Sequence, residues 1–113
     1  MSKTVDLNLM GYQIHHNATE KGFWSEREGV DAVNQYLAKL MLVDTEVSEL
    51  VDAYVKERGA EAIELEFADI LIRVLDLYQA MKEDGVVERK LPDVLNEKIE
   101  FNSTRPKKHN RLM

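Results

Sequence analysis

Apolar residues return every three or four positions along almost the whole chain, which is the spacing of one face of an α-helix. Ser25 and Glu28 have the spacing of a capping box that starts a helix, and Gly59 is suited to end one. No alternation typical of strands competes with this pattern. We therefore predict an all-α protein with a four-helix-bundle-like fold, with helices over about residues 6–19, 25–57, 60–82 and 92–102.

Length and charge restrict the organisation of the chain. At 113 residues it suits a single domain, 1–113, and so short a domain buries little surface, which favours a homo-oligomer, a dimer or tetramer. The net charge is −6, yet residues 101–113 carry four basic side chains and no acid. We expect an irregular basic tail over about 104–113, which is either a solvated end or an anion contact. The acidic remainder makes nucleic-acid binding an unexpected role.

Composition also predicts the environment of the protein. No apolar stretch approaches the roughly 18 residues needed to cross a bilayer, and the first residues lack the apolar core of a signal peptide. We therefore expect a cytoplasmic protein without a membrane partner. The absence of cysteine excludes disulfides and thiolate metal sites, so any metal must be held by oxygen or imidazole.

Two pairs of carboxylates stand out within the apolar runs. Glu46 and Glu49 are three positions apart, as are Glu66 and Asp69, so each pair lies on one helical face. A hairpin turn near Gly59 would bring the two pairs level within about one helical turn. Four converging acids repel one another unless a cation joins them, and oxygen ligands favour Mg²⁺, with Mn²⁺ as a possibility. The alternative is that these acids face water and pair with neighbouring bases, Lys39, Lys56, Arg73 or Lys82.

The order of these acids resembles a known metal signature. Glu46-x-x-Glu49, a turn, and Glu66-x-x-Asp69 running into Ile-Leu-Ile-Arg-Val-Leu-Asp is similar to that of the MazG-like nucleotide pyrophosphohydrolases, in the all-α NTP pyrophosphatase superfamily. The likeness covers about residues 10–111, including His15, Lys21-Gly22-Phe23-Trp24 and Lys98-x-x-x-Asn102-x-x-Arg105-Pro106-x-Lys108-His109. One departure is Thr45, where many members carry a further glutamate.

The resemblance implies a MazG-type fold and a magnesium-dependent enzyme. Such an enzyme cleaves a nucleoside triphosphate between the α and β phosphates, giving the monophosphate and pyrophosphate. Glu46, Glu49, Glu66 and Asp69 are implied as metal ligands and catalytic residues, with Glu49 or Glu46 also orienting or deprotonating the water. The chain has no Gly-x-x-x-x-Gly-Lys sequence, so we expect that the phosphates of the substrate are not held by a glycine-rich loop. The base and the sugar of the substrate stay open.

The same resemblance implies two groups of substrate-binding residues. Lys98 and Asn102, four apart on one helical face, would contact phosphate or sugar, and Arg105 and Lys108 would extend this cationic clamp. Lys21 belongs to the matching segment upstream and is expected to bind substrate as well.

Base recognition is expected from the segment that joins the first two helices. Trp24 offers a planar face for a nucleobase, and His15 resembles a base-pocket histidine. The alternatives are an aromatic residue that packs helices and an ordinary, partly buried histidine. Asp76 is interpreted as a surface acid, with a supporting role beside the metal ligands as the alternative.

Two other functional classes are alternatives to the hydrolase. A di-iron helical bundle expects Glu-x-x-His on two helices, and neither Glu46 nor Glu66 has a histidine three positions later. A non-enzymatic helical interaction module, or a nucleic-acid-associated accessory protein, is the stronger rival. Magnesium distinguishes this interaction module from the hydrolase, because only the metal enzyme is expected to gain thermal stability from the ion.

Overall fold

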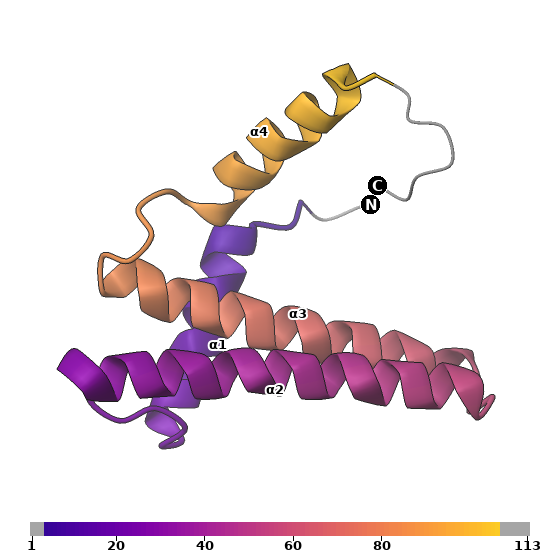
Figure 1. The fold of residues 1–113 in the computed structure, drawn as a ribbon, viewed down its shortest axis with the longest axis horizontal. Coiled ribbons are helices and arrows are strands. Elements are labelled where there is room, and N and C mark those ends of the chain that lie inside the picture. The colour runs from indigo at the N-terminus through magenta and orange to yellow at the C-terminus, as the bar shows by residue number, and fades with distance from the viewer. Residues whose placement is uncertain (1–3, 107–113) are drawn as a thin grey trace.

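The computed structural model describes residues 4–106, and within them the chain is helical without any strand. Its elements are α1 (Leu7–Glu20), α2 (Gly29–Val55), α3 (Ala60–Glu83) and α4 (Leu91–Thr104). The all-α prediction is confirmed, and three of the four helices begin and end within about two residues of the predicted bounds. The two long helices, α2 and α3, form an antiparallel hairpin, with α1 packed across α3 (Figure 1).

The start of α2 differs from the prediction. The helix begins at Gly29, and the proposed capping box at Ser25 is wrong, because Glu28 is extended (φ −133°) and its side chain caps nothing. Gly29 has φ +54°, a left-handed conformation that prevents the helix from continuing backwards. Instead the Ser25 N–H donates to Gln35 Oε1 at 3.0 Å, and Gln35 Nε2 donates to the Glu26 carbonyl at 2.9 Å. One glutamine of α2 therefore holds the preceding segment against the helix.

The core of the single chain is small and lies where α1 crosses α3. Gly11 lies at this crossing, where a Cβ would be in ordinary van der Waals contact with the Leu75 carbonyl oxygen at 3.5 Å. Beyond it, α1, α3 and the segment before α2 bury a cluster made of Ala18, Trp24, Leu77 and Ala80. Tyr36 and Met81 pack against this cluster. The core therefore lies at the end of the hairpin that is remote from its turn.

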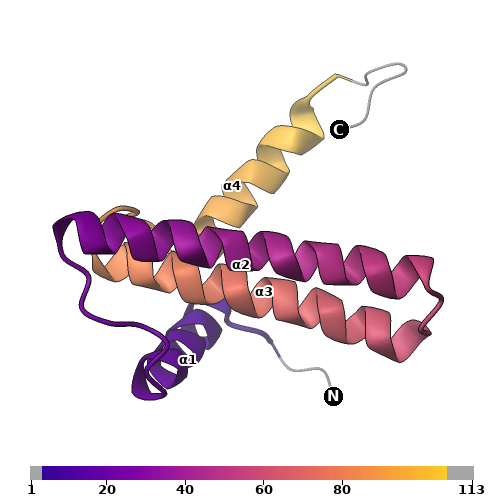
Figure 2. The same cartoon turned by 60° about the horizontal axis from the view of Figure 1, so that its bottom comes forward.

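Helix α4 extends away from the hairpin in both views (Figures 1 and 2). Pro92 lies in its first turn, as predicted, and the Tyr78 hydroxyl donates to the Arg89 carbonyl at 2.7 Å in the preceding loop. The first turns of α4 pack against α1, yet no residue of the helix is buried. Residues 4–106 of one chain thus do not close into a four-helix bundle.

The hairpin leaves large apolar side chains open to solvent. Tyr54 is 72% exposed, Phe67 56% and Leu71 59%, although all three lie on the amphipathic stripes of α2 and α3. Leu50, Val51 and Ile63 join Tyr54 and Phe67 around an apolar hollow of about 530 Å³. Within the described part of the chain, no helix is both long and apolar enough to span a membrane.

Candidate metal centre

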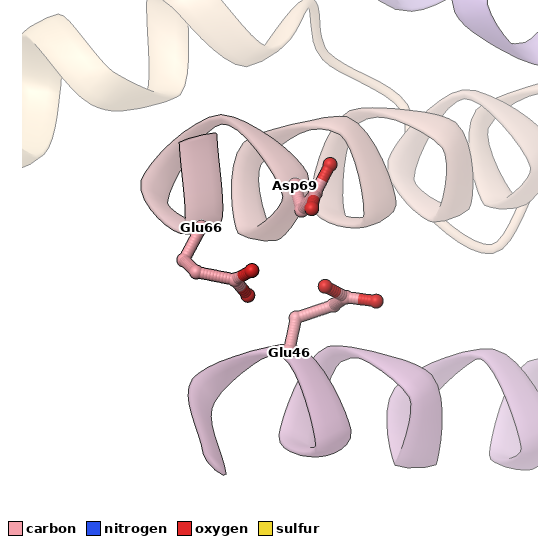
Figure 3. A group of neighbouring side chains, drawn as sticks. All are labelled: Glu46, Glu66 and Asp69. Carbon is pink, nitrogen blue, oxygen red and sulfur yellow. The ribbon is translucent and has the colours of Figure 1, made fainter. Parts of the chain in front are cut away.

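Three predicted metal ligands converge between α2 and α3. Glu46 extends from α2 toward Glu66 and Asp69 on α3 (Figure 3), and one oxygen of each lies within 4.8 Å of the other two. The spacing of Glu66 and Asp69 puts both on the face of α3 that meets α2. The antiparallel hairpin then brings Glu46 level with them. These three carboxylates form the acid cluster.

The acid cluster is partly buried and incompletely bonded. Glu46 is only 8% exposed, and buried oxygens of two residues, Glu46 Oε2 and Glu66 Oε2, have no hydrogen-bond partner among the described residues. Burial raises the pKa of Glu46, and the charges of Glu49 and Asp69 raise it further. Buried, unpaired carboxylate oxygens are costly unless a cation or a donor reaches them. An all-oxygen set of this kind fits a hard divalent ion such as Mg²⁺.

Glu49, the fourth predicted ligand, lies at the edge of the cluster. It is exposed and is not one of the three residues whose oxygens converge. Its charge nevertheless contributes to the raised pKa of Glu46, one helical turn away. The structure therefore brings three of the four predicted ligands together and leaves Glu49 beside them, facing solvent.

Among the residues that the structure describes, one basic side chain forms an ion pair with the acid cluster. Arg73 Nε lies 3.6 Å from Glu46 Oε1, and its side chain is 37% exposed. The other three bases that sequence offered as partners are engaged elsewhere. Lys39 Nζ donates to the Phe23 carbonyl at 2.7 Å, Lys56 pairs with Asp52, and Lys82 donates to Asn8 Oδ1 at 2.9 Å.

Further along the same face of α3, Asp76 is the centre of a second polar group. Its Oδ1 lies 2.7 Å from His15 Nδ1, and the Trp24 indole N–H donates to both of its oxygens at 3.0 and 3.1 Å. Asp76 is 5% exposed, so its interpretation as a surface acid is wrong. His15 of α1 and Trp24 of the segment after it contact the carboxylate and cover it.

The two residues expected to recognise a base are covered in this arrangement. His15 is 3% and Trp24 6% exposed, and their rings meet edge to face with centroids 5.2 Å apart. Lys39 Nζ lies 4.5 Å and Arg27 Cζ 5.0 Å from the centroid of the Trp24 ring. Stacking on a nucleobase would therefore require side chains to move away from the indole, whereas the alternative of a packing aromatic needs no change.

Sequence reasoning missed a third polar group beside Trp24. Arg27 Nε donates to Asp84 Oδ2 at 2.6 Å, and the Tyr36 hydroxyl donates to the same oxygen. The hydrogen bond from Arg27 is the main reason that the pKa of Asp84 lies below its ordinary value. These partners are 48 and 57 positions apart, and no local motif marks them. A pocket of about 370 Å³ opens beside the group.

The described members of the predicted phosphate clamp do not lie at the acid cluster within one chain. Lys98 Nζ lies 5.0 Å and Arg105 Cζ 6.0 Å from the centre of the Phe101 ring, at the end of α4 that points away from the hairpin. Asn102 is exposed on the same turns, and Lys21 is exposed at the end of α1. Lys108 lies outside the described residues.

Comparisons with protein-family models, with curated proteins and with solved structures found no match to this chain.

Proposed function

We propose that this protein is a magnesium-dependent nucleotide pyrophosphohydrolase of the MazG-like type, acting in the cytoplasm to remove unwanted nucleotides. It would convert a nucleoside triphosphate into its monophosphate and pyrophosphate. The observation that carries the proposal is the convergence of Glu46, Glu66 and Asp69 with two buried, unpartnered carboxylate oxygens. Without a cation such an arrangement is unfavourable, so its presence between the two longest helices favours a functional site over a structural one.

The residues of the site would have different roles. Glu46, Glu66 and Asp69 would hold the ion, which when bound neutralises phosphate charge and activates water. Glu49 is exposed at the edge of the cluster, where its carboxylate could orient a water molecule or take its proton. Glu46 is buried, and the lower dielectric constant around it would strengthen the attraction between its carboxylate and a bound cation.

The proposal includes a homo-oligomer, a dimer or a tetramer. Lys98 and Asn102 lie on the far part of α4 and Arg105 directly follows it, so any contact they make with phosphate at the acid cluster would come from a second copy of the chain. The exposed apolar side chains of α2 and α3, such as Tyr54 and Phe67, provide a surface for such a copy.

The test is the identity of the bond that breaks. The chain is incubated with Mg²⁺ in oxygen-18 water and with a panel of ribo- and deoxyribonucleoside triphosphates, and the products are weighed by mass spectrometry. We expect the label in the monophosphate and intact pyrophosphate as the other product. A diphosphate with labelled orthophosphate would contradict the mechanism. Glu46→Gln is the control for a contaminating phosphatase, because it should abolish all release.

A second candidate is a helical interaction module without catalysis, and the observation in its favour is the exposed apolar surface of the hairpin. Magnesium distinguishes the two functions. An interaction module should melt at the same temperature with and without the ion, whereas the hydrolase should be stabilised by it.

A further inference from the structure

Among residues 4–106, Arg73 is the base that forms an ion pair with the acid cluster, and this pair is long. The Nε to Oε1 distance to Glu46 is 3.6 Å, and no hydrogen bond joins the two side chains. A settled pair between a guanidinium and a carboxylate is usually bidentate, with nitrogen to oxygen distances of about 2.7–2.9 Å. Arg73 therefore interacts with the cluster through its charge. Its N–H groups form no side-chain hydrogen bond with the other described residues.

The position of Arg73 suits a second partner. It follows Asp69 by four residues, so both side chains lie on the face of α3 that meets α2. More than a third of its side chain is exposed, so a ligand can reach it from solvent. Lys39, the other base near this face, already donates to the Phe23 carbonyl and lies over the Trp24 ring. Within the described part of the chain, Arg73 is therefore the base next to the acids that has no hydrogen-bonded partner.

Charge explains why this side chain would change partners. In the free chain Glu46, Glu49, Glu66 and Asp69 carry up to four negative charges, and Arg73 offsets one of them. A divalent cation held by the same oxygens would offset two charges at shorter range and would repel the guanidinium. A triphosphate that joins the ion would then bring new anionic oxygens to the same place. Arginine suits such oxygens, since its planar fork donates two parallel hydrogen bonds.

We infer that Arg73 balances the acid cluster in the free chain and becomes a phosphate ligand of the substrate when a divalent cation takes its place beside Glu46. This inference rests on the proposed function and names a substrate-binding residue on the hairpin itself. It requires no contribution from α4. The sequence alone offered Arg73 only as a partner for acids.

The experiment separates the metal from the phosphate. Full-length wild-type chain and Arg73→Gln are titrated calorimetrically with Mn²⁺ alone. They are then titrated, in saturating Mg²⁺, with α,β-imido ribo- and deoxyribonucleoside triphosphates carrying each of the common bases, which cannot be cleaved between the α and β phosphates. Arg73→Lys keeps the charge and loses the planar fork. Arg58→Gln is the matched control, because it removes the same charge from the turn of the hairpin, where Arg58 pairs with Asp52 at 2.8 Å.

We expect Arg73→Gln to bind Mn²⁺ at least as tightly as wild type, since a competing cation is gone. It should bind the best nucleotide analogue about 10- to 100-fold more weakly, the range for a lost hydrogen bond to a charged group. Arg73→Lys should lose less, and Arg58→Gln should match wild type in both titrations. The ¹⁵N resonance of Arg73 Nε gives an independent readout: it should move when Mg²⁺ is added alone and again when the analogue binds.

Three outcomes would overturn the inference. Nucleotide affinity of Arg73→Gln within twofold of wild type would show that Arg73 touches no phosphate. Equal losses of Mn²⁺ and nucleotide affinity would show that it only supports the cluster, and if Arg73→Gln fails to fold, the same two comparisons apply to Arg73→Lys. Wild-type chain that binds Mn²⁺ but none of the ribo- and deoxyribonucleotide analogues would contradict the proposed function along with the inference, whereas the first two outcomes leave that function intact.

Discussion

His15 Nδ1 and Asp76 Oδ1 lie 2.7 Å apart, although 61 positions separate the two residues in the sequence. The same carboxylate accepts the indole N–H of Trp24, so one buried acid joins α1, the segment before α2, and α3. In a core that consists of few large side chains, a polar junction of this kind has a large share in fixing how the helices cross.

The first prediction follows from this junction. Asp76→Ala should lower the free energy of unfolding by about 2–4 kcal/mol, because it leaves the buried donors of Trp24 and His15 without an acceptor. Urea denaturation followed by circular dichroism measures the change. Asp52→Ala is the control: Asp52 also pairs with two bases, yet it is 40% exposed, and its loss should cost less than about 1 kcal/mol. Similar losses for both variants would contradict the assigned role of burial.

The second prediction concerns the acids. Asp69→Asn and Glu66→Gln should remove the rise in melting temperature produced by Mg²⁺, a stabilisation of about 2.7 kcal/mol for wild type at one hundred times its dissociation constant. Without the ion the variants should be at least as stable as wild type, because each relieves repulsion within the cluster. Differential scanning fluorimetry with and without Mg²⁺ checks both statements. Glu64→Gln, an exposed acid on the same helix, should keep the full response.

If Asp69→Asn, Glu66→Gln and wild type showed an equal rise in melting temperature with Mg²⁺, the proposed metal centre would be contradicted. The same experiment on Glu49→Gln tests its position at the edge of the cluster. We expect that variant to keep most of the thermal response and to lose turnover, since its carboxylate is exposed beside the converging oxygens.

The third prediction is a dependence of stability on pH that arises from Asp84. Its folded pKa lies below the ordinary value of 3.8, mainly because of the hydrogen bond from Arg27. A lowered pKa adds stability that is fully present above pH 3.8 and is lost as the pH falls through the folded value. Asp84→Asn should therefore be less stable than wild type at pH 6, and the difference should shrink steadily below pH 3.8. Urea denaturation between pH 6 and pH 2.5 measures this difference.

Glu88→Gln serves as the control for Asp84→Asn, since Glu88 is exposed in the following loop. It should change stability little at either end of the pH range. A constant difference between wild type and Asp84→Asn across the range would show that the carboxylate acts through packing and not through its charge.

The fourth prediction concerns assembly. Wild-type chain should sediment as a dimer or larger at micromolar concentration, and Tyr54→Lys should shift it toward monomer, because a charge would enter the apolar hollow on the hairpin. Val86→Lys is the matched control, since Val86 is similarly exposed (58%) but lies in the loop after α3. A compact monomer across micromolar concentrations for wild type would contradict the proposed oligomer.

The sequence predicted those features that depend on local spacing. Periodicity gave the helices, and the intervals between Glu46, the turn at Gly59 and Glu66 predicted that acids of two helices would meet, which Glu46, Glu66 and Asp69 do. The start of α2 was predicted wrongly because the spacing of Ser25 and Glu28 is only a local signal. A left-handed Gly29 and the distant side chain of Gln35 override it.

Features that depend on the crossing of helices could not be predicted in this way. The burial of Asp76 could not be predicted, because no residue near it in the sequence indicates that His15 and Trp24 cover its side chain. Arg27 and Asp84 meet for the same reason, across 57 positions. Helical spacing fixes which face a residue occupies, whereas the burial of that face depends on which helix crosses it.

Helix α4 contributes no buried residue to the single chain, and at 14 residues it is close to the shortest length at which an isolated helix persists in water. Its backbone hydrogen bonds therefore have little protection of their own. In dilute solution the amide hydrogens of residues 91–104 should exchange with deuterium far faster than those of α3. If a second copy covers this helix, their exchange should slow as protein concentration rises, while the exchange of the buried turns of α3 stays constant. The time course of deuterium uptake along one helix would then report how the whole chain associates.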